Sequence, residues 1–213
     1  MPNQIRHPKL FIMPYLEHHP VDYFPRHLLQ DEIADPRLAI RRIFDEELNM
    51  VDARKWLDKW LNTLFGEKRV LGRKFIVLLM DLQEALLKLL EAAYLLQLED
   101  PSLHKEVSIT VMKGTGLPVP SLYCGITHKE YTAWDYFPRH LTRKEFTDPY
   151  RVFSKLCRYK QLPEWRDTLQ NFFSAAVSGT RIYECCEDGN VYLTGKYLLK
   201  LVEAVHLVNV RES

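Results

Sequence analysis

Arginine and histidine stand next to each other at two related places in this sequence, where together they could bind an anion. Residues 22–28 and residues 135–141 both read Asp-Tyr-Phe-Pro-Arg-His-Leu, 113 positions apart. Arginine forms charge-assisted, often bidentate hydrogen bonds with phosphate and carboxylate groups, and histidine gains charge as the pH falls through roughly 6.5. The repeat therefore predicts a site for an anionic ligand or an acidic peptide. The predicted ligand-binding residues are Arg26, His27, Tyr23, Arg139, His140 and Tyr136.

This prediction requires the two copies of the motif to face one groove, as they would if a pseudo-twofold axis related them. The same seven residues also suit a structural role. In that role the aromatic residues fill the core, proline sets the path of the chain, and aspartate pairs with arginine. Packing constraints hold a motif in two copies as readily as a binding site does. The sequence alone leaves both interpretations open.

The likeness between the two parts of the chain continues beyond the motif. An Asp-Pro step recurs at residues 35–36 and 148–149. The apolar residues 86–96 match residues 198–208 at an offset of 112. These matches predict an internal duplication with the same order of helices in each copy.

We expect residues 1–100, called here the first half, to form one copy. Residues 101–213, called the second half, contain a linker and the other copy. The closing segments 86–96 and 198–208 are apolar on nearly all sides, and helices of this kind are buried between neighbours. We therefore expect these two segments to pack against each other and the two halves to form one joint domain.

Helical signals dominate both halves. Asp35-Pro36 and Asp148-Pro149 are typical helix starts, because aspartate caps free backbone amides and proline has the backbone angle of the first helical turn. After each start, apolar residues recur at spacings of three and four, which predicts amphipathic helices. Gly66 and Gly179 follow where a helix end favours a residue with positive φ.

A smaller part of the chain has the composition of strands. Residues 107–112 read as a strand, and residues 181–186 and 190–194 flank a Glu-Asp-Gly turn that predicts a hairpin. Residues 75–80 fit a strand or an early start of the following helix, and periodicity does not separate the two. The predicted fold class is mainly α with minor β.

The composition of the 213-residue chain is that of an ordinary globular protein, with 46% hydrophobic and 27% charged residues. Its net charge of +1 provides no overall attraction to nucleic acid or to an anionic membrane. The most apolar stretch, residues 75–97, carries four charged residues, so we expect no membrane span. The four cysteines form no CxxC pair and no secretory signal pattern is visible, which favours reduced thiols in the cytoplasm.

These features predict a non-enzymatic cytoplasmic binding or regulatory protein whose groove lies between the two halves. Its partner is an unidentified protein or an anionic ligand. No cofactor is expected, and no metal, because His18-His19 lacks a third ligand at a suitable spacing.

Two other functions stay open. One is a DNA- or RNA-binding regulator that uses a basic connector. The residues of that connector are Lys68, Arg69, Arg73 and Lys74. The other is a small-molecule enzyme of unidentified chemistry. For this alternative no catalytic residue can be named, because the chain has no nucleophile elbow, phosphate-binding loop or zinc-protease helix motif.

Overall fold

The computed structural model of the chain describes residues 19–65, 71–99, 108–112, 116–125, 129–179 and 191–212. In the first half the elements are η1 (Pro20–Tyr23), α1 (Gln30–Ala34), α2 (Pro36–Arg42), the π-helical turn η2 (Ile43–Glu47), α3 (Met50–Phe65) and α4 (Arg73–Gln97). In the second half they are η4 (Pro120–Leu122), η5 (Ala133–Tyr136), α5 (Arg143–Thr147), α6 (Tyr150–Tyr159), α7 (Leu162–Ser178) and α9 (Val191–Glu212). The described residues are thus mostly helical, which confirms the mainly α prediction.

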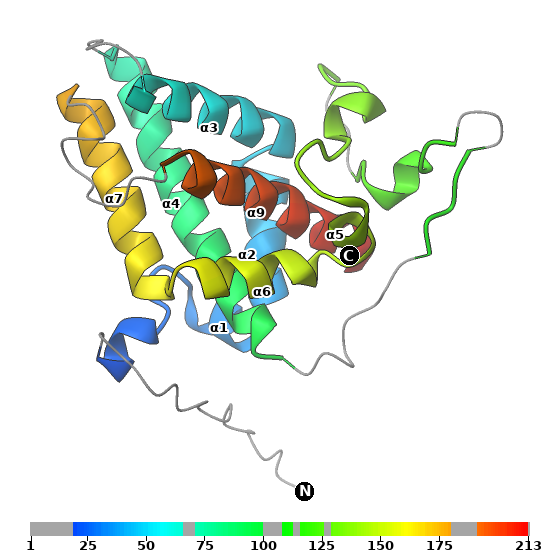
Figure 1. Cartoon of the computed structure of the whole chain (residues 1–213), viewed down its shortest axis with the longest axis horizontal. Coiled ribbons are helices and arrows are strands. Elements are labelled where there is room, and N and C mark those ends of the chain that lie inside the picture. Colours follow the sequence, from blue (N-terminus) through cyan, green and yellow to red (C-terminus); the bar gives the residue numbers. More distant parts are fainter. Residues whose placement is uncertain are drawn as a thin grey trace, which may run out of the picture.

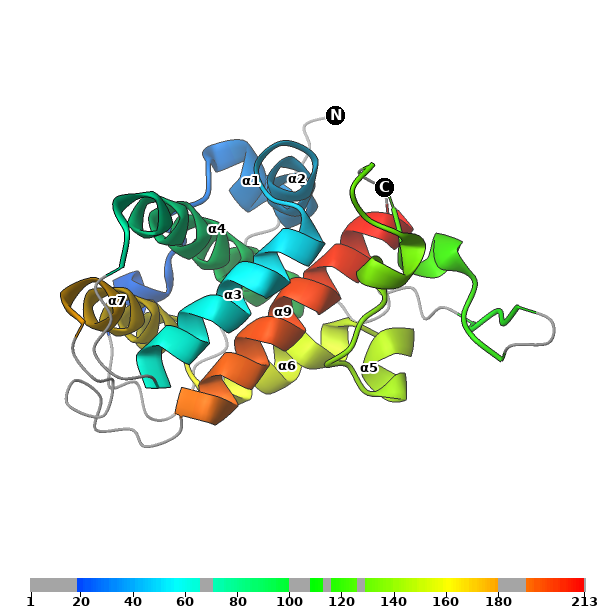
Figure 2. The same ribbon diagram turned by 90° about the horizontal axis from the view of Figure 1, so that it is seen from above.

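The helices of the two halves interleave around one core. The longest helices, α4 and α9, contact each other, and each also packs against helices from the other half of the chain. Helix α4 lies beside α7 on one side of the molecule, and α9 lies beside α3 in both views (Figures 1 and 2). Buried apolar side chains from both halves form a single cluster.

The apolar periodicity explains why α4 is a helix along its whole length. Leu79, Leu82, Leu86 and Leu89 recur at spacings of three and four, and each is buried. The helix begins at Arg73, so residues 75–80 belong to it and form no strand. In α9, a Cβ atom added to Gly195 would lie 2.7 Å from a methyl carbon of Leu61 in α3, so glycine permits these two helices to approach closely.

The ends of the helices follow the local sequence closely. The Asp35 carboxylate accepts a hydrogen bond from the Arg37 amide at 3.1 Å, which confirms the predicted cap of α2. At the corresponding place in the second half, α6 begins one residue later than predicted, at Tyr150. The predicted cap at Asp148 is therefore wrong: its carboxylate accepts a hydrogen bond from the Arg151 side chain, Nε, at 3.0 Å instead of from a backbone amide of α6. Gly179 ends α7 with a φ of 65°, as predicted. Gly66 lies outside the described residues.

The predicted minor β structure is wrong for the part of the chain that can be described, where the extended pairing is limited to an isolated bridge between Val111 and Pro118. Residues 191–194, expected in a hairpin strand, form the first turn of α9. There Val191 and Thr194 are buried at the same helical spacing that continues to Leu198, so tertiary packing overrides the strand propensity of this stretch. The rest of the predicted hairpin and Val107 lie outside the described residues.

None of the helices in the described ranges combines the length and apolar composition that a membrane span needs.

Candidate functional site

The first copy of the seven-residue motif surrounds a buried carboxylate. The backbone amides of Arg26 and His27 donate hydrogen bonds of 2.8–3.0 Å to Glu91 of α4, and His27 Nδ1 lies 2.9 Å from the same side chain. Glu91 is completely buried. Burial by itself raises the pKa of this carboxyl, but the hydrogen bonds from His27, both amides and Arg166 outweigh it and lower the pKa to about 2.

The second copy of the motif has the same arrangement around Glu203 of α9. The amides of Arg139 and His140 donate to Glu203 at 2.9 and 2.8 Å, and His140 Nδ1 lies 3.0 Å from it. Here too burial raises the pKa of the carboxyl, and the hydrogen bonds from His140 and the two amides lower it further than burial raises it. Glu91 and Glu203 occupy equivalent positions in the matched apolar segments 86–96 and 198–208. In each half, the seven-residue motif therefore contacts the matched apolar segment.

Each buried carboxylate also receives an arginine from the other half of the chain. Arg54 of α3 reaches Glu203 at 3.1 Å, and Arg54 itself is buried. Arg166 of α7 reaches Glu91 with Nε at 3.0 Å and Nη2 at 2.6 Å. Arg54 and Arg166 stand 112 positions apart, the same offset that separates the two carboxylates.

The remaining donors of these arginines bind carbonyl oxygens of the opposite motif. Arg54 donates to the carbonyls of Asp135 at 2.6 Å and Phe137 at 3.2 Å. Arg166 donates to the corresponding carbonyls of the first motif, those of Asp22 and Phe24. Each short turn is thus held by a helix from the other half.

Sequence reasoning missed these four residues. The available signal was the shared offset: an arginine and a glutamate each recur 112 positions apart, inside helices that also match. A charged residue retained at the same place in two apolar segments indicates a buried partner.

The two predicted tyrosines also contact the opposite half. The hydroxyl of Tyr136 accepts a hydrogen bond from Asn49 Nδ2 at 2.8 Å, and Tyr136 is 1% exposed. Tyr23, which is half-buried, donates its hydroxyl to Gln161. Asn49 and Gln161 precede α3 and α7 and stand 112 positions apart.

The structure therefore uses the main chain of the Arg-His pairs to bind buried carboxylates. The side chain of Arg26 pairs with Asp22 of its own motif at 2.7 Å, while that of Arg139 is exposed. A common anion groove formed by both Arg-His pairs stays a prediction. Titration of phosphate into wild type and into an Arg26→Ala, Arg139→Ala double variant tests it.

A pocket of about 250 Å³ lies between the two halves, where the first turn of α3 faces the end of α9. The first half contributes Arg41, Phe44, Asp45, Asn49 and Met50, and the second half contributes Gly125, Tyr136, His206, Asn209 and Val210. Of the predicted site residues that the structure describes, Tyr136 lines this pocket.

His206 is the most unusual side chain of the pocket. It is 5% exposed, its ring stacks on Tyr136 with centroids 5.8 Å apart, and the ring of Phe44 meets it edge-on at 5.3 Å. Nε2 lies 3.0 Å from the carbonyl oxygen of Tyr123, whereas the buried Nδ1 has no hydrogen-bond partner among the described residues. Burial lowers the pKa of His206 to about 4, so the ring is neutral at pH 7.

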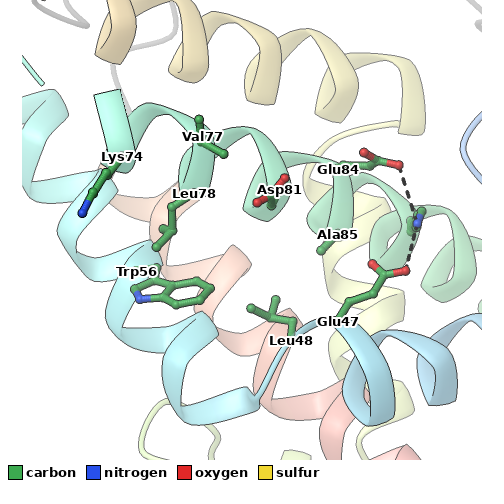
Figure 3. A pocket seen from close by; sticks show the side chains of 10 residues that line it. Glu47, Leu48, Trp56, Lys74, Val77, Leu78, Asp81, Glu84 and Ala85 are labelled. Atoms are coloured by element: carbon green, nitrogen blue, oxygen red, sulfur yellow. Dashed lines mark hydrogen bonds and ion pairs between the residues drawn. The ribbon is translucent and has the colours of Figure 1, made fainter. Parts of the chain in front are cut away.

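A larger groove, of about 500 Å³, lies within the first half between α3 and α4 (Figure 3). Leu78 points towards Trp56, and exposed charged side chains, including Lys74 and Asp81, also line the groove. At one end Lys88 pairs with Glu47 at 3.2 Å and Glu84 at 3.6 Å. The charges at this end of the groove are thus partly neutralised.

The other residues considered from the sequence have local explanations or lie outside the described part. Arg73 and Lys74 begin α4, whereas Lys68 and Arg69 are not among the described residues. The His19 ring accepts a hydrogen bond from the Val21 amide and caps η1. The described residues contain no cluster of three or more side chains suited to hold a metal ion.

Of the cysteines, Cys124 and Cys157 are free thiols. Burial raises the pKa of both, that of Cys157 to about 12, so neither is a reactive thiolate at pH 7. Cys185 and Cys186 fall in the range that the structure does not describe.

Neither a protein-family model, nor a curated protein, nor a solved structure matches this chain.

Proposed function

We propose that the chain is an internally duplicated helical domain whose halves are related by a pseudo-twofold axis. The support comes from equivalent contacts made in both directions between the halves. The ion pair of Arg54 in the first half with Glu203 in the second corresponds to the ion pair of Arg166 in the second half with Glu91 in the first. Trp60 and Phe172 also stand 112 positions apart and contact each other, with ring centroids 6.5 Å apart. A residue that contacts its own counterpart lies near the symmetry axis.

We further propose that the protein is a non-enzymatic cytoplasmic binding protein whose ligand is a small molecule held between the two halves. The observation that carries this proposal is the pocket around His206, which lies between the two halves and is lined by the aromatic side chains of Tyr136 and Phe44. Pockets of this composition, apolar with a few polar groups, are typical of small-molecule sites. The symmetry-related region has Tyr94 at the position of His206, so the two halves differ at this point.

The pocket supports binding better than catalysis because Asn49, Tyr136 and one nitrogen of His206 are already used in structural hydrogen bonds. Asn49 donates to Tyr136 and accepts from the Val51 amide at 2.7 Å. The neutral, buried His206 donates through Nε2 to a backbone carbonyl. Cys124 and Cys157 are free thiols, which fits a compartment in which thiols stay reduced.

A fragment screen by NMR with the full chain tests the binding proposal. We expect a subset of fragments to shift resonances of α9 and of the start of α3. Val210→Trp fills the pocket from α9 and should remove this binding. Val177→Trp is the matched control, because Val177 is 43% exposed on α7 and does not line the pocket. Fragment binding that survives Val210→Trp, or the absence of any binding fragment, would overturn the proposal.

A further inference from the structure

We infer that the groove between α3 and α4 is a docking site for a partner protein, which inserts a tyrosine flanked by basic residues. The groove shares no lining residue with the pocket between the halves, so this inference goes beyond the proposed binding function. It relies on the proposed duplication, in which matching positions of the two halves are 112 residues apart, like the buried Arg54 and Arg166.

The two halves carry different side chains at the place of this groove. Glu47 ends η2 and lines the groove, and Ala85 lines it from α4. The matching residues are Tyr159, which ends α6, and Tyr197 of α9. Their rings stack with centroids 4.6 Å apart, and the Tyr159 hydroxyl lies 3.1 Å from Thr194 Oγ1. Under the proposed duplication, two tyrosines thus stand in the second half where the first half has an open groove.

The apolar surface of the groove is accessible to a partner. Val77 is 52% exposed, and the half-buried Trp56 and Leu78 line the same groove (Figure 3). The volume of about 500 Å³ has room for an aromatic ring and for neighbouring residues of the same segment. Aromatic side chains that fill such pockets contribute strongly to protein–protein binding.

The charges of the groove favour a basic segment. Three carboxylates and two ammonium groups line it, those of Glu47, Asp81, Glu84, Lys74 and Lys88. Three negative charges against two positive ones leave a net charge of −1. Lys88 is shared by Glu47 and Glu84, and the exposed Asp81 has no ion pair with the residues that the structure describes. A cation beside the entering ring would therefore be attracted, with the modest energy of an exposed ion pair.

The second half also shows a cation next to its tyrosine pair. Lys160 directly follows Tyr159, and its Nζ lies 5.9 Å from the centroid of the Tyr159 ring. The matching residue in the first half is the buried Leu48, which supplies no charge. Residues 158–160 read Arg-Tyr-Lys, and we expect the partner's segment to have the same chemistry.

The test is an NMR titration of the full chain, labelled with ¹⁵N, with the peptide acetyl-Ser-Arg-Tyr-Lys-Ser-amide. We expect the indole N–H resonance of Trp56 and the amide resonances around Val77 to shift. Alanine in place of the peptide's tyrosine should weaken binding about 10-fold or more, and glutamate in place of both basic residues about 3-fold or more. Equal affinity of the alanine peptide or of the glutamate peptide, or no binding of the tyrosine peptide, would overturn the inference.

A double variant that closes the groove provides the second test. Glu47→Tyr with Ala85→Tyr introduces the tyrosine pair of the second half, and should keep the circular dichroism spectrum but lose the peptide. Leu98→Tyr is the matched control, because Leu98 is 47% exposed at the end of α4 and does not line the groove. If the double variant fails to fold, Val77→Arg decides. It places a repelling cation at an exposed position of the groove, and unchanged affinity for the peptide would contradict docking there.

Val210→Trp separates this site from the pocket between the halves. We expect this variant to retain the affinity for the peptide, because Val210 does not line the groove. Peptide binding that is lost in Val210→Trp and kept in the double variant would assign the peptide to the other pocket and overturn the inference. A peptide that does not bind at all overturns the docking site, while the fragment screen by itself decides the proposed function.

Discussion

Arg54 and Glu203 are 149 positions apart in the sequence and form an ion pair at 3.1 Å in the interior of the protein. The pair joins α3 of the first half to α9 of the second, and the same arginine binds two carbonyl oxygens of the second motif. Arg166 and Glu91 make the corresponding connection in the opposite direction. Charged groups at this depth are stable only when their partners are in place.

Removal of one arginine should therefore be strongly destabilising. We expect Arg54→Ala to lower the free energy of unfolding by about 3–5 kcal/mol, because Glu203 would stay buried with one partner fewer. Chemical denaturation followed by circular dichroism measures the change. Arg26→Ala is the matched control: its side chain is 52% exposed and pairs with Asp22, so its loss should cost less than about 1 kcal/mol. Equal costs for the two variants would contradict the buried pair as a main support of the fold.

Protonation of Glu91 at acidic pH should lower the free energy of unfolding. The pKa of Glu91 is lowered from 4.5 to about 2 by its hydrogen bonds. A carboxyl with a lowered pKa contributes stability that is present above the unfolded value and is lost as the pH falls towards the folded value. We expect the free energy of unfolding to decrease between pH 4.5 and 2, and to decrease less in Glu91→Gln. A series of denaturation curves across this range checks the slope, and identical slopes would be the contrary result.

Protonation of His206 should lower the free energy of unfolding in a higher pH range than protonation of Glu91. Its pKa is lowered from 6.5 to about 4 by burial, so the unfolded chain takes up a proton between these values before the folded protein does. Stability should fall by up to about 3 kcal/mol as the pH decreases from 6.5 to 4. The measurement is the unfolding free energy of wild type and His206→Gln at both pH values. A difference between pH 6.5 and pH 4 that persists unchanged in His206→Gln would assign the effect to another group.

The cap of α2 should have a smaller and local effect. Asp35→Ala removes the hydrogen bond to the Arg37 amide and is expected to cost about 0.5–2 kcal/mol. Glu46→Ala, at an exposed position of η2, serves as the control with little expected change. Thermal and chemical denaturation of both variants measure the difference, and a neutral Asp35→Ala would remove the cap as a source of stability.

The sequence by itself determined the features that depend on neighbouring residues. The helical class, the cap at Asp35 and the end of α7 at Gly179 follow from apolar spacing, from a side chain that binds an amide two residues on, and from the backbone freedom of glycine. The repeated motif was also visible, because identity of seven residues requires no knowledge of the fold.

Tertiary structure alone decided what the repeated residues do. The motif amides meet Glu91 and Glu203 because the chain returns through α4 and α9, and local sequence contains no information about that approach. The same reason applies to Val191, whose strand-like surroundings become helical when it packs in the core, and to His206, whose unused Nδ1 results from burial beside Tyr136 and Phe44. Contacts between distant residues determine burial, and burial determines which polar groups find partners.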